Sequence, residues 1–144
     1  MTPIETAWSV ETFMGRAFSV RVGDPAPGGG VGAPTLTLKV HPLSVSTDQA
    51  VSIGVIVTEL VTNAVKYAYG PGQGGEIRII LEPDPGNGRA LLTVEDDGPG
   101  MGDGKPRGTG LGGKIVAAMA AGLRSAVEVD PSHKGVRARL AFDL

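Results

Sequence analysis

Apolar residues recur at helical spacing in the middle of the chain, and this is the strongest structural signal in the sequence. From about Asp48 to Tyr67 they fall at positions i, i+3, i+4 and i+7, which predicts a helix with one buried face. Thr47 or Asp48 can cap the start of this helix. Its apolar stripe consists of Ile53, Ile56, Val57, Leu60, Val61, Ala64, Val65 and Ala68.

Strand patterns lie on both sides of this helix. Before it, residues 35–40 alternate between apolar and polar, as a half-buried strand does, and residues 43–46 predict a second short strand. After it, residues 76–82 and 90–95 predict two strands joined by a turn-rich segment. Such a pair is most simply antiparallel.

The C-terminal third predicts a second helix and a last pair of strands. The helix begins near Leu111 and ends at Gly122, and the strands cover about 124–129 and 136–142. In this order the elements predict an α+β fold: a two-layer sandwich of a mixed, mainly antiparallel sheet with helices on one face.

The first 34 residues read differently from the rest. Residues 4–22 carry scattered apolar positions that predict a helix or a connector, and the proline- and glycine-rich residues 23–34 break the chain. We therefore expect residues 1–34 to be an N-terminal connector and flexible linker. Residues 35–144 are expected to form the compact domain.

Composition narrows the possible functions. A chain of 144 residues is about one domain. Its net charge of -2, from 13 basic and 15 acidic residues scattered along the chain, provides no basic stripe for nucleic acid. The chain has no cysteine, so disulfides and thiolate chemistry are excluded. No apolar run approaches the ~20 residues that span a bilayer, which predicts a cytoplasmic module, alone or within a larger membrane-attached sensor.

One face of the long predicted helix is polar. Glu59, Asn63 and Lys66 share the side opposite the apolar stripe. A solvated surface explains this arrangement as well as a site does. As a site, the carboxylate and amide oxygens suit magnesium, which prefers oxygen ligands beside substrate phosphates, and Lys66 could reach a phosphate.

Asp97 opens a turn that follows an apolar strand. Gly98 and Gly100 flank Pro99 in this turn and allow the backbone to approach a ligand closely. An ordinary turn capped by aspartates is one explanation. The other is a carboxylate at the floor of a pocket, which would accept a hydrogen bond from the amine of adenine and disfavour guanine, whose carbonyl lies at that position.

A second glycine-rich run immediately precedes the second helix. It is Gly108-Thr109-Gly110-Leu111-Gly112-Gly113, and its N–H groups together with the helix dipole could bind phosphate. The run matches neither the Walker motif nor a dinucleotide fingerprint. Residues 101–107 between the two glycine loops could form a lid. Its Lys105 and Arg107 could touch phosphates, or they could simply be solvated.

The order ELVTNAVKYA, DDGPGM and GTGLG resembles the Bergerat ATP-binding fold shared by gyrase, Hsp90, histidine kinases and MutL. The phrase GVIVTELVTNAVKYAY is most similar to sensor histidine kinases of the second dimerisation-domain type, relatives of the HWE kinases. The resemblance spans about residues 35–144. Two HWE features are missing: Thr58 stands where that group has histidine, and the chain lacks its tryptophan motif.

The resemblance implies ATP and Mg²⁺ as cofactors and assigns roles to site residues. Asn63 would coordinate Mg²⁺, and Glu59 would act as a base or orient the reacting groups, contacting the metal through water. Asp97 would bind the adenine amine. The remaining ATP-binding residues that it implies are Lys66, Tyr67, Gly98, Gly100, Met101, Gly108, Thr109, Gly110, Leu111 and Gly112.

Two further differences from the family concern the nucleotide and the phosphate acceptor. Val136 follows Gly135 where the family often has a threonine that joins the adenine network. The acceptor should be a histidine on an exposed helix, whereas His41 and His133 lie in turn-like segments and are expected to be structural or solvated. The acceptor would then belong to a separate dimerisation domain, in the same chain or another one, and a response regulator would follow it.

The resemblance leaves three functions to compare. The first is an ATP:protein-histidine phosphotransferase. The second is an anti-sigma factor serine kinase, and the third is a nucleotide-binding scaffold without transfer activity. The presence of Glu59, Asn63 and Asp97 favours an active kinase over the scaffold.

Overall fold

The computed structural model describes residues 7–9, 34–67, 75–84, 88–98 and 111–144. Its main sheet has five strands in the order β2-β4-β5-β7-β6. The strands are β2 (Pro34–Val40), β4 (Gly75–Asp84), β5 (Arg89–Asp96), β6 (Glu128–Val129) and β7 (Arg137–Asp143). Strands β2 and β4 pair in parallel and the other neighbours are antiparallel.

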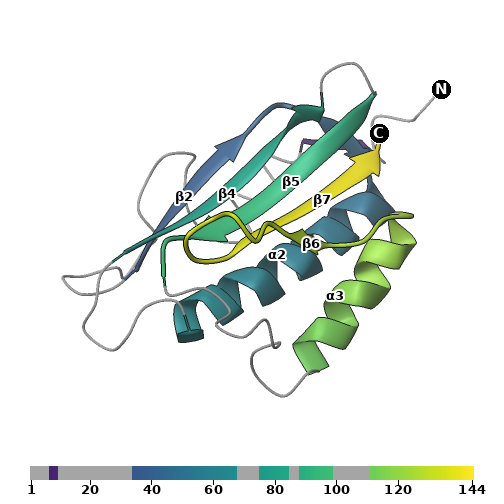
Figure 1. Cartoon of the computed structure of the whole chain (residues 1–144). Coiled ribbons are helices and arrows are strands. Elements are labelled where there is room, and N and C mark those ends of the chain that lie inside the picture. Colours follow the sequence, from purple (N-terminus) through teal and green to yellow (C-terminus); the bar gives the residue numbers. More distant parts are fainter. Residues whose placement is uncertain (1–6, 10–33, 68–74, 85–87, 99–110) are drawn as a thin grey trace.

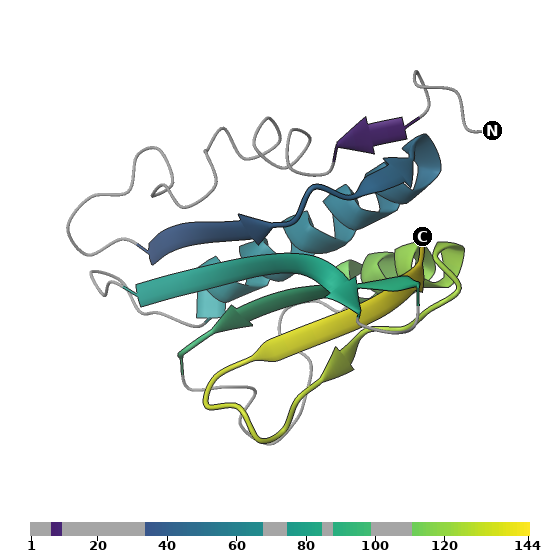
Figure 2. The ribbon, with the colours of Figure 1, turned by 90° about the horizontal axis from the view of Figure 1, so that it is seen from above.

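Two helices, α2 (Thr47–Tyr67) and α3 (Leu111–Gly122), cover one face of this sheet. Figure 1 shows both helices on the same side, and Figure 2 shows the strands side by side from β2 to β6. The predicted α+β sandwich with a mainly antiparallel sheet is confirmed. None of the helices in the described part of the chain is long and apolar enough to cross a bilayer.

The core lies between the helices and the inner face of the sheet. Strand residues alternate across a sheet, so every second residue of β2, β4, β5 and β7 points toward α2 and α3. Phe142 is the largest fully buried side chain, and Ile53 and Ile56 of α2 are equally inaccessible. Val65, expected in the apolar stripe, is instead 48% exposed.

Helix α2 starts with a reciprocal cap. The Ser46 hydroxyl accepts a hydrogen bond from the Gln49 N–H (3.1 Å), and the Gln49 side-chain oxygen accepts one from the Ser46 N–H (3.0 Å). This is the S-x-x-Q form of the capping box. The sequence alone suggested Thr47 or Asp48 as the cap, whereas the structure shows that the cap is Ser46.

Part of the expected N-terminal connector is a strand. β1 (Ala7–Ser9) pairs antiparallel with β3 (Ser44–Ser46), and Trp8 lies opposite Val45. A helix, one of the two structures expected for residues 4–22, is therefore not formed by these three residues. Their hydrogen-bonding partner lies more than 30 residues further along the chain, so local periodicity carried no sign of it. The proposed linker, residues 23–33, lies outside the described residues.

Candidate functional site

A cavity of about 120 Å³ opens between α2 and the end of the sheet that carries Asp96. That volume is well above the ~10–15 Å³ that one water needs, so the cavity can take a small organic ring. Among the described residues that line it, Asn63 and Asp96 alone have polar side chains. The lining residues are Leu60, Asn63, Ala64, Val94, Asp96, Val127, Val129, Val136 and Ala138.

Asp96 is the buried carboxylate of this cavity. Only 2% of the residue is exposed. Its Oδ1 accepts hydrogen bonds from the N–H groups of Gly98 (2.9 Å) and Val136 (3.3 Å). Among the residues that the structure describes, no donor reaches Oδ2. A buried carboxylate oxygen without a donor is costly, so this atom is suited to receive a hydrogen bond from a bound ligand.

Gly135 lets the β6–β7 turn approach Asp96 closely. Its φ is +91°, a conformation that favours glycine. A Cβ there would lie 2.4 Å from the backbone oxygen of Asp96 and 2.8 Å from Oδ1. Val136 follows with its N–H on Oδ1, so a backbone group contacts the carboxylate at the position where the family often has a threonine.

Of the residues that the sequence placed on one polar helix face, the structure describes the side chains of Asn63 and Glu59. Asn63 lines the cavity. Glu59 lies one turn earlier on α2, is partly exposed, and is not part of the cavity wall. Lys66 and Tyr67 belong to the last turn of α2, and their side chains lie outside the described residues.

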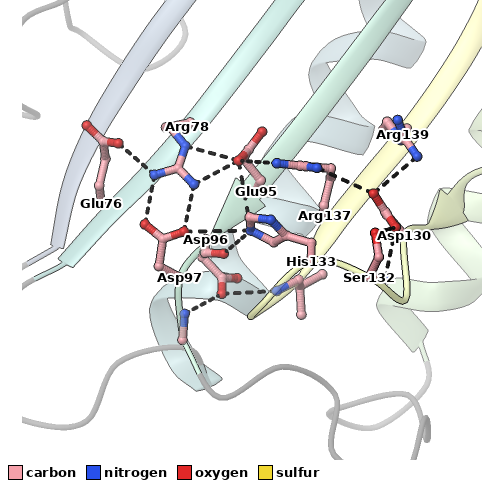
Figure 3. A network of polar contacts seen from close by, with 12 residues as sticks. Glu76, Arg78, Glu95, Asp96, Asp97, Asp130, Ser132, His133, Arg137 and Arg139 are labelled. Atoms are coloured by element: carbon pink, nitrogen blue, oxygen red, sulfur yellow. Dashed lines mark hydrogen bonds and ion pairs between the residues drawn. The ribbon is translucent and has the colours of Figure 1, made fainter.

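Asp97, predicted as the cavity carboxylate, does not line the cavity. Its side chain is 51% exposed and forms two 2.8 Å hydrogen bonds to the Arg78 guanidinium. Figure 3 shows it with the charged groups of the sheet face that α2 and α3 leave uncovered. Asp96, one residue earlier, lines the cavity instead, because side chains alternate along β5: Leu92, Val94 and Asp96 share the inner face, whereas Thr93, Glu95 and Asp97 share the other.

The predicted glycine loops are only partly described. Gly98 is buried, and its N–H binds Asp96 as given above. Leu111 and Gly112 form the start of α3, as the sequence predicted for this helix. The remaining predicted loop and lid residues lie outside the described residues: Gly100, Met101, Lys105, Arg107, Gly108, Thr109 and Gly110.

Arg78 is the centre of an ion-pair network on the outer face of the sheet. It pairs with Glu76 (2.7 Å), Glu95 (2.7 Å) and Asp97 (2.8 Å). Hydrogen bonds from Arg78 lower the pKa of Glu76 and of Asp97. Burial alone would raise the pKa of Glu95, but hydrogen bonds from Arg78 and Arg137 lower it overall. These carboxylates in turn raise the pKa of Arg78, Asp97 most strongly.

The network continues across the sheet to β6 and β7. Arg137 pairs with Glu95 (3.3 Å) and Asp130 (3.4 Å), and Arg139 also pairs with Asp130 (3.3 Å). Hydrogen bonds from the Ser132 hydroxyl and N–H lower the pKa of Asp130 to about 2. The outer face therefore carries paired charges from β4 to Asp130, the residue that follows β6, as Figure 3 shows.

The two histidines have different surroundings. His133 Nε2 lies 2.8 Å from the backbone oxygen of Asp96, and the ring is only 12% exposed. His41 is exposed, with Nδ1 3.2 Å from the Leu81 oxygen. Neither lies on a helix, so the geometry agrees with the expectation that they are structural or solvated.

Arg78→Lys should lower the free energy of unfolding by about 1–2 kcal/mol at neutral pH, because an ammonium cannot reproduce the forked bonds to these carboxylates. The folded protein lowers the pKa of these carboxylates from their unfolded values, 4.5 for the two glutamates and 3.8 for Asp97. The network therefore stabilises the fold fully at pH values above these unfolded pKa values. This stability is lost as the pH falls through the lower pKa values of the folded state. The difference from wild type should therefore shrink below about pH 4 in urea unfolding.

Arg89→Lys is the matched control for this prediction. Arg89 pairs with Asp143, whose side chain is 78% exposed, and an exposed pair of this kind contributes about 0–1 kcal/mol. We expect a change below about 0.5 kcal/mol. A difference between Arg78→Lys and wild type that stays constant down to acid pH would contradict the role given to the three carboxylates.

Residues 48–144 match the family described as histidine kinase-, DNA gyrase B-, and HSP90-like ATPase. Over 108 residues, the chain is 31% identical to blue-light-activated histidine kinase 2 of Erythrobacter litoralis strain HTCC2594. The matched region covers 74% of this chain and 31% of that protein. The chain thus spans about a third of this curated relative.

Two solved structures show the same architecture. The histidine kinase domain of the Erythrobacter litoralis EL346 blue-light activated histidine kinase superposes with a TM-score of 0.68 at 28% identity, covering 78% of this chain and 52% of that chain. The mycobacterial sensor histidine kinase MprB has a TM-score of 0.65 at 22% identity, covering 94% of this chain and 95% of that one. The second likeness concerns the fold alone.

Proposed function

The chain belongs to the family of histidine kinase-, DNA gyrase B- and HSP90-like ATPases, and from this we propose that it is the ATP-binding catalytic domain of a sensor histidine kinase. The observation that carries the proposal is the buried Asp96 in the cavity beside Asn63. The identity to a histidine kinase over 74% of the chain supports the choice of this branch of the family.

We assign recognition of the adenine base to Asp96 and no longer to Asp97. Adenine has an exocyclic amine that can donate to Oδ2, the oxygen for which the described residues supply no donor. The apolar walls formed by Val94, Val129 and Val136 suit a flat ring. Guanine would place a carbonyl against the carboxylate, so the site should reject it.

For the phosphates, we propose that Asn63 and Glu59 serve a magnesium ion. No group of three or more histidine, cysteine, aspartate or glutamate side chains that could hold a metal ion by itself occurs among the described residues. Mg²⁺ does not need one, because it keeps several waters and takes one or two protein oxygens beside substrate phosphates. An amide and a carboxylate one helical turn apart fit this chemistry. The bound ion would neutralise phosphate charge, while Glu59 orients the reacting groups or acts as a base.

The remaining contacts follow the family motifs. Lys66 would support the phosphates, and the second glycine run would wrap them with its N–H groups. Gly98 and Gly100 would shape the base pocket. The further residues in this proposal are Tyr67, Met101, Gly108, Thr109, Gly110, Leu111 and Gly112.

The phosphate acceptor in this proposal is a histidine of a dimerisation domain, supplied by the same chain or by a partner. His133 is committed to a backbone bond, and His41 lies outside the helices, so neither resembles an acceptor on an exposed helix. A response regulator would then receive the phosphate from that domain. Because its substrate is ATP, we propose a cytoplasmic location.

Calorimetry with ADP and GDP, each with and without Mg²⁺, tests the proposal. We expect ADP to bind at least about tenfold more tightly than GDP, since the guanine carbonyl would leave the Asp96 carboxylate unpaired. Asn63→Ala should remove the magnesium-dependent part of the ADP affinity, about tenfold, because the ion loses a protein ligand. Equal affinity for ADP and GDP would rule out the adenine site.

Transfer is tested with γ-labelled ATP and a dimerisation domain from the histidine kinase relative. The label should appear on histidine, in an acid-labile and base-stable linkage. Label on serine would favour an anti-sigma factor kinase instead. Nucleotide binding without any transfer to the supplied domain would favour the scaffold alternative.

A further inference from the structure

His133 contacts the site through the backbone of Asp96. It belongs to the turn between β6 and β7, and its Nε2 lies 2.8 Å from the Asp96 carbonyl oxygen. A carbonyl oxygen can only accept, so Nε2 must carry the hydrogen. The neutral ring supplies this donor as the Nε2–H tautomer, and the bond therefore does not require a charged histidine.

This bond completes the fixation of Asp96. The Asp96 N–H donates to the Val136 oxygen (2.9 Å), and Oδ1 accepts from Gly98 and Val136. With the carbonyl held by His133, the peptide plane between Asp96 and Asp97 cannot rotate freely. The next peptide unit carries the Gly98 N–H that donates to Oδ1, so rotation of the Asp96–Asp97 plane would move this donor and change the direction of the carboxylate.

The His133 ring also lies beside carboxylates of the outer face, at distances too long for hydrogen bonds. Its Nε2 lies 3.6 Å from Asp97 Oδ1 and 3.9 Å from Glu95 Oε2, and Arg78 binds both carboxylates. Figure 3 shows the ring between these acids and Asp96. The imidazole thus lies between the charged outer face and the backbone of Asp96.

We propose that His133 is a positioning residue that sets the direction of the Asp96 carboxylate and thereby the selectivity of the site for a 6-amino purine. The inference rests on the proposed adenine site and adds a residue that touches neither the base nor the phosphates. It assigns a role in specificity to a side chain on the far side of the strand from the ligand.

The experiment compares ADP with inosine diphosphate, which differs at the base in carrying a 6-oxo group instead of the 6-amino group. His133→Gln places an amide nitrogen near the position of Nε2, whereas His133→Met has similar length and no donor. We expect the ratio of ADP to IDP affinity to fall at least fivefold in His133→Met and to stay within twofold of wild type in His133→Gln. A merely structural role would weaken both nucleotides equally and leave this ratio unchanged.

Two outcomes separate this inference from the proposed function. If wild type binds ADP and IDP equally, the adenine site fails and the inference fails with it. If wild type discriminates and a folded His133→Met discriminates equally well, only the positioning role is overturned. Should His133→Met not fold, His133→Asn replaces it, because its amide nitrogen stops one bond short of the Asp96 oxygen.

The ¹⁵N NMR shifts of the wild-type ring should show the Nε2–H tautomer at neutral pH, and the Nδ1–H tautomer would contradict the bond.

Discussion

Asp96→Asn is expected to weaken ADP binding by about 1.5 to 3 kcal/mol, roughly 10- to 150-fold, because a hydrogen bond to a charged group contributes that much. The asparagine oxygen can keep the bonds from Gly98 and Val136. Its NH₂ group would then face the amine of adenine, donor against donor, in a cavity that is otherwise apolar. Calorimetry measures the loss, and the preference for ADP over GDP should disappear with it.

Asp97→Asn is the matched control, since it makes the same chemical change one residue away. Its side chain lies on the outer face and keeps one oxygen for Arg78, so we expect ADP affinity to change less than about threefold. The opposite result, with Asp97→Asn abolishing ADP binding and Asp96→Asn tolerated, would restore the assignment made from sequence alone.

Gly135→Ala should lower the free energy of unfolding by about 3 kcal/mol or more and remove ADP binding in what remains folded. Two effects add together: the positive φ is strained for alanine, and the new Cβ would lie 2.4 Å from the Asp96 oxygen and 2.9 Å from the Gly98 nitrogen. The turn must move away from Asp96, which breaks the bond from the Val136 N–H. Thermal unfolding should show a decrease in Tm of about 10 °C or more.

Gly88→Ala provides the comparison that separates these two effects. Gly88 also has a positive φ, +62°, but a Cβ there would have nothing within 4 Å. Gly88→Ala should therefore lower the free energy of unfolding through backbone strain alone, by about 1–2 kcal/mol, and leave the ADP affinity unchanged. Equal destabilisation by the two substitutions would mean that the contact of Gly135 with Asp96 adds nothing.

Much of the fold could be predicted because its signals are local. The predicted long helix differs from α2 by about one residue at its start, and the predicted antiparallel pair is β4 and β5. Helix α3 has the predicted bounds, Leu111–Gly122. In each case the period of apolar residues reflects one buried face, which the sequence displays directly. Strand β1 was missed because its partner β3 lies far along the chain.

The site was predicted less completely than the fold. Asn63 lines the cavity and lies on a helix that the sequence could identify, while its role toward magnesium stays a prediction. Between the adjacent acids, Asp97 was chosen from the turn that it opens. The alternation of Leu92, Val94 and Asp96 along β5 contained the better signal, because a strand directs every second side chain to the same face.

The amino-acid order alone was enough for the class of fold, the helix that carries Asn63, and the resemblance to ATP-binding kinases, since these depend on short-range periodicity and contiguous motifs. The alternation along β5 favours Asp96 over Asp97, but the amino-acid order could not connect His133 and Gly135 to Asp96. Those contacts join residues nearly 40 positions apart, and they exist only because β5 pairs with β7. Sheet pairing thus brings the β6–β7 turn onto Asp96 and defines which carboxylate faces the cavity.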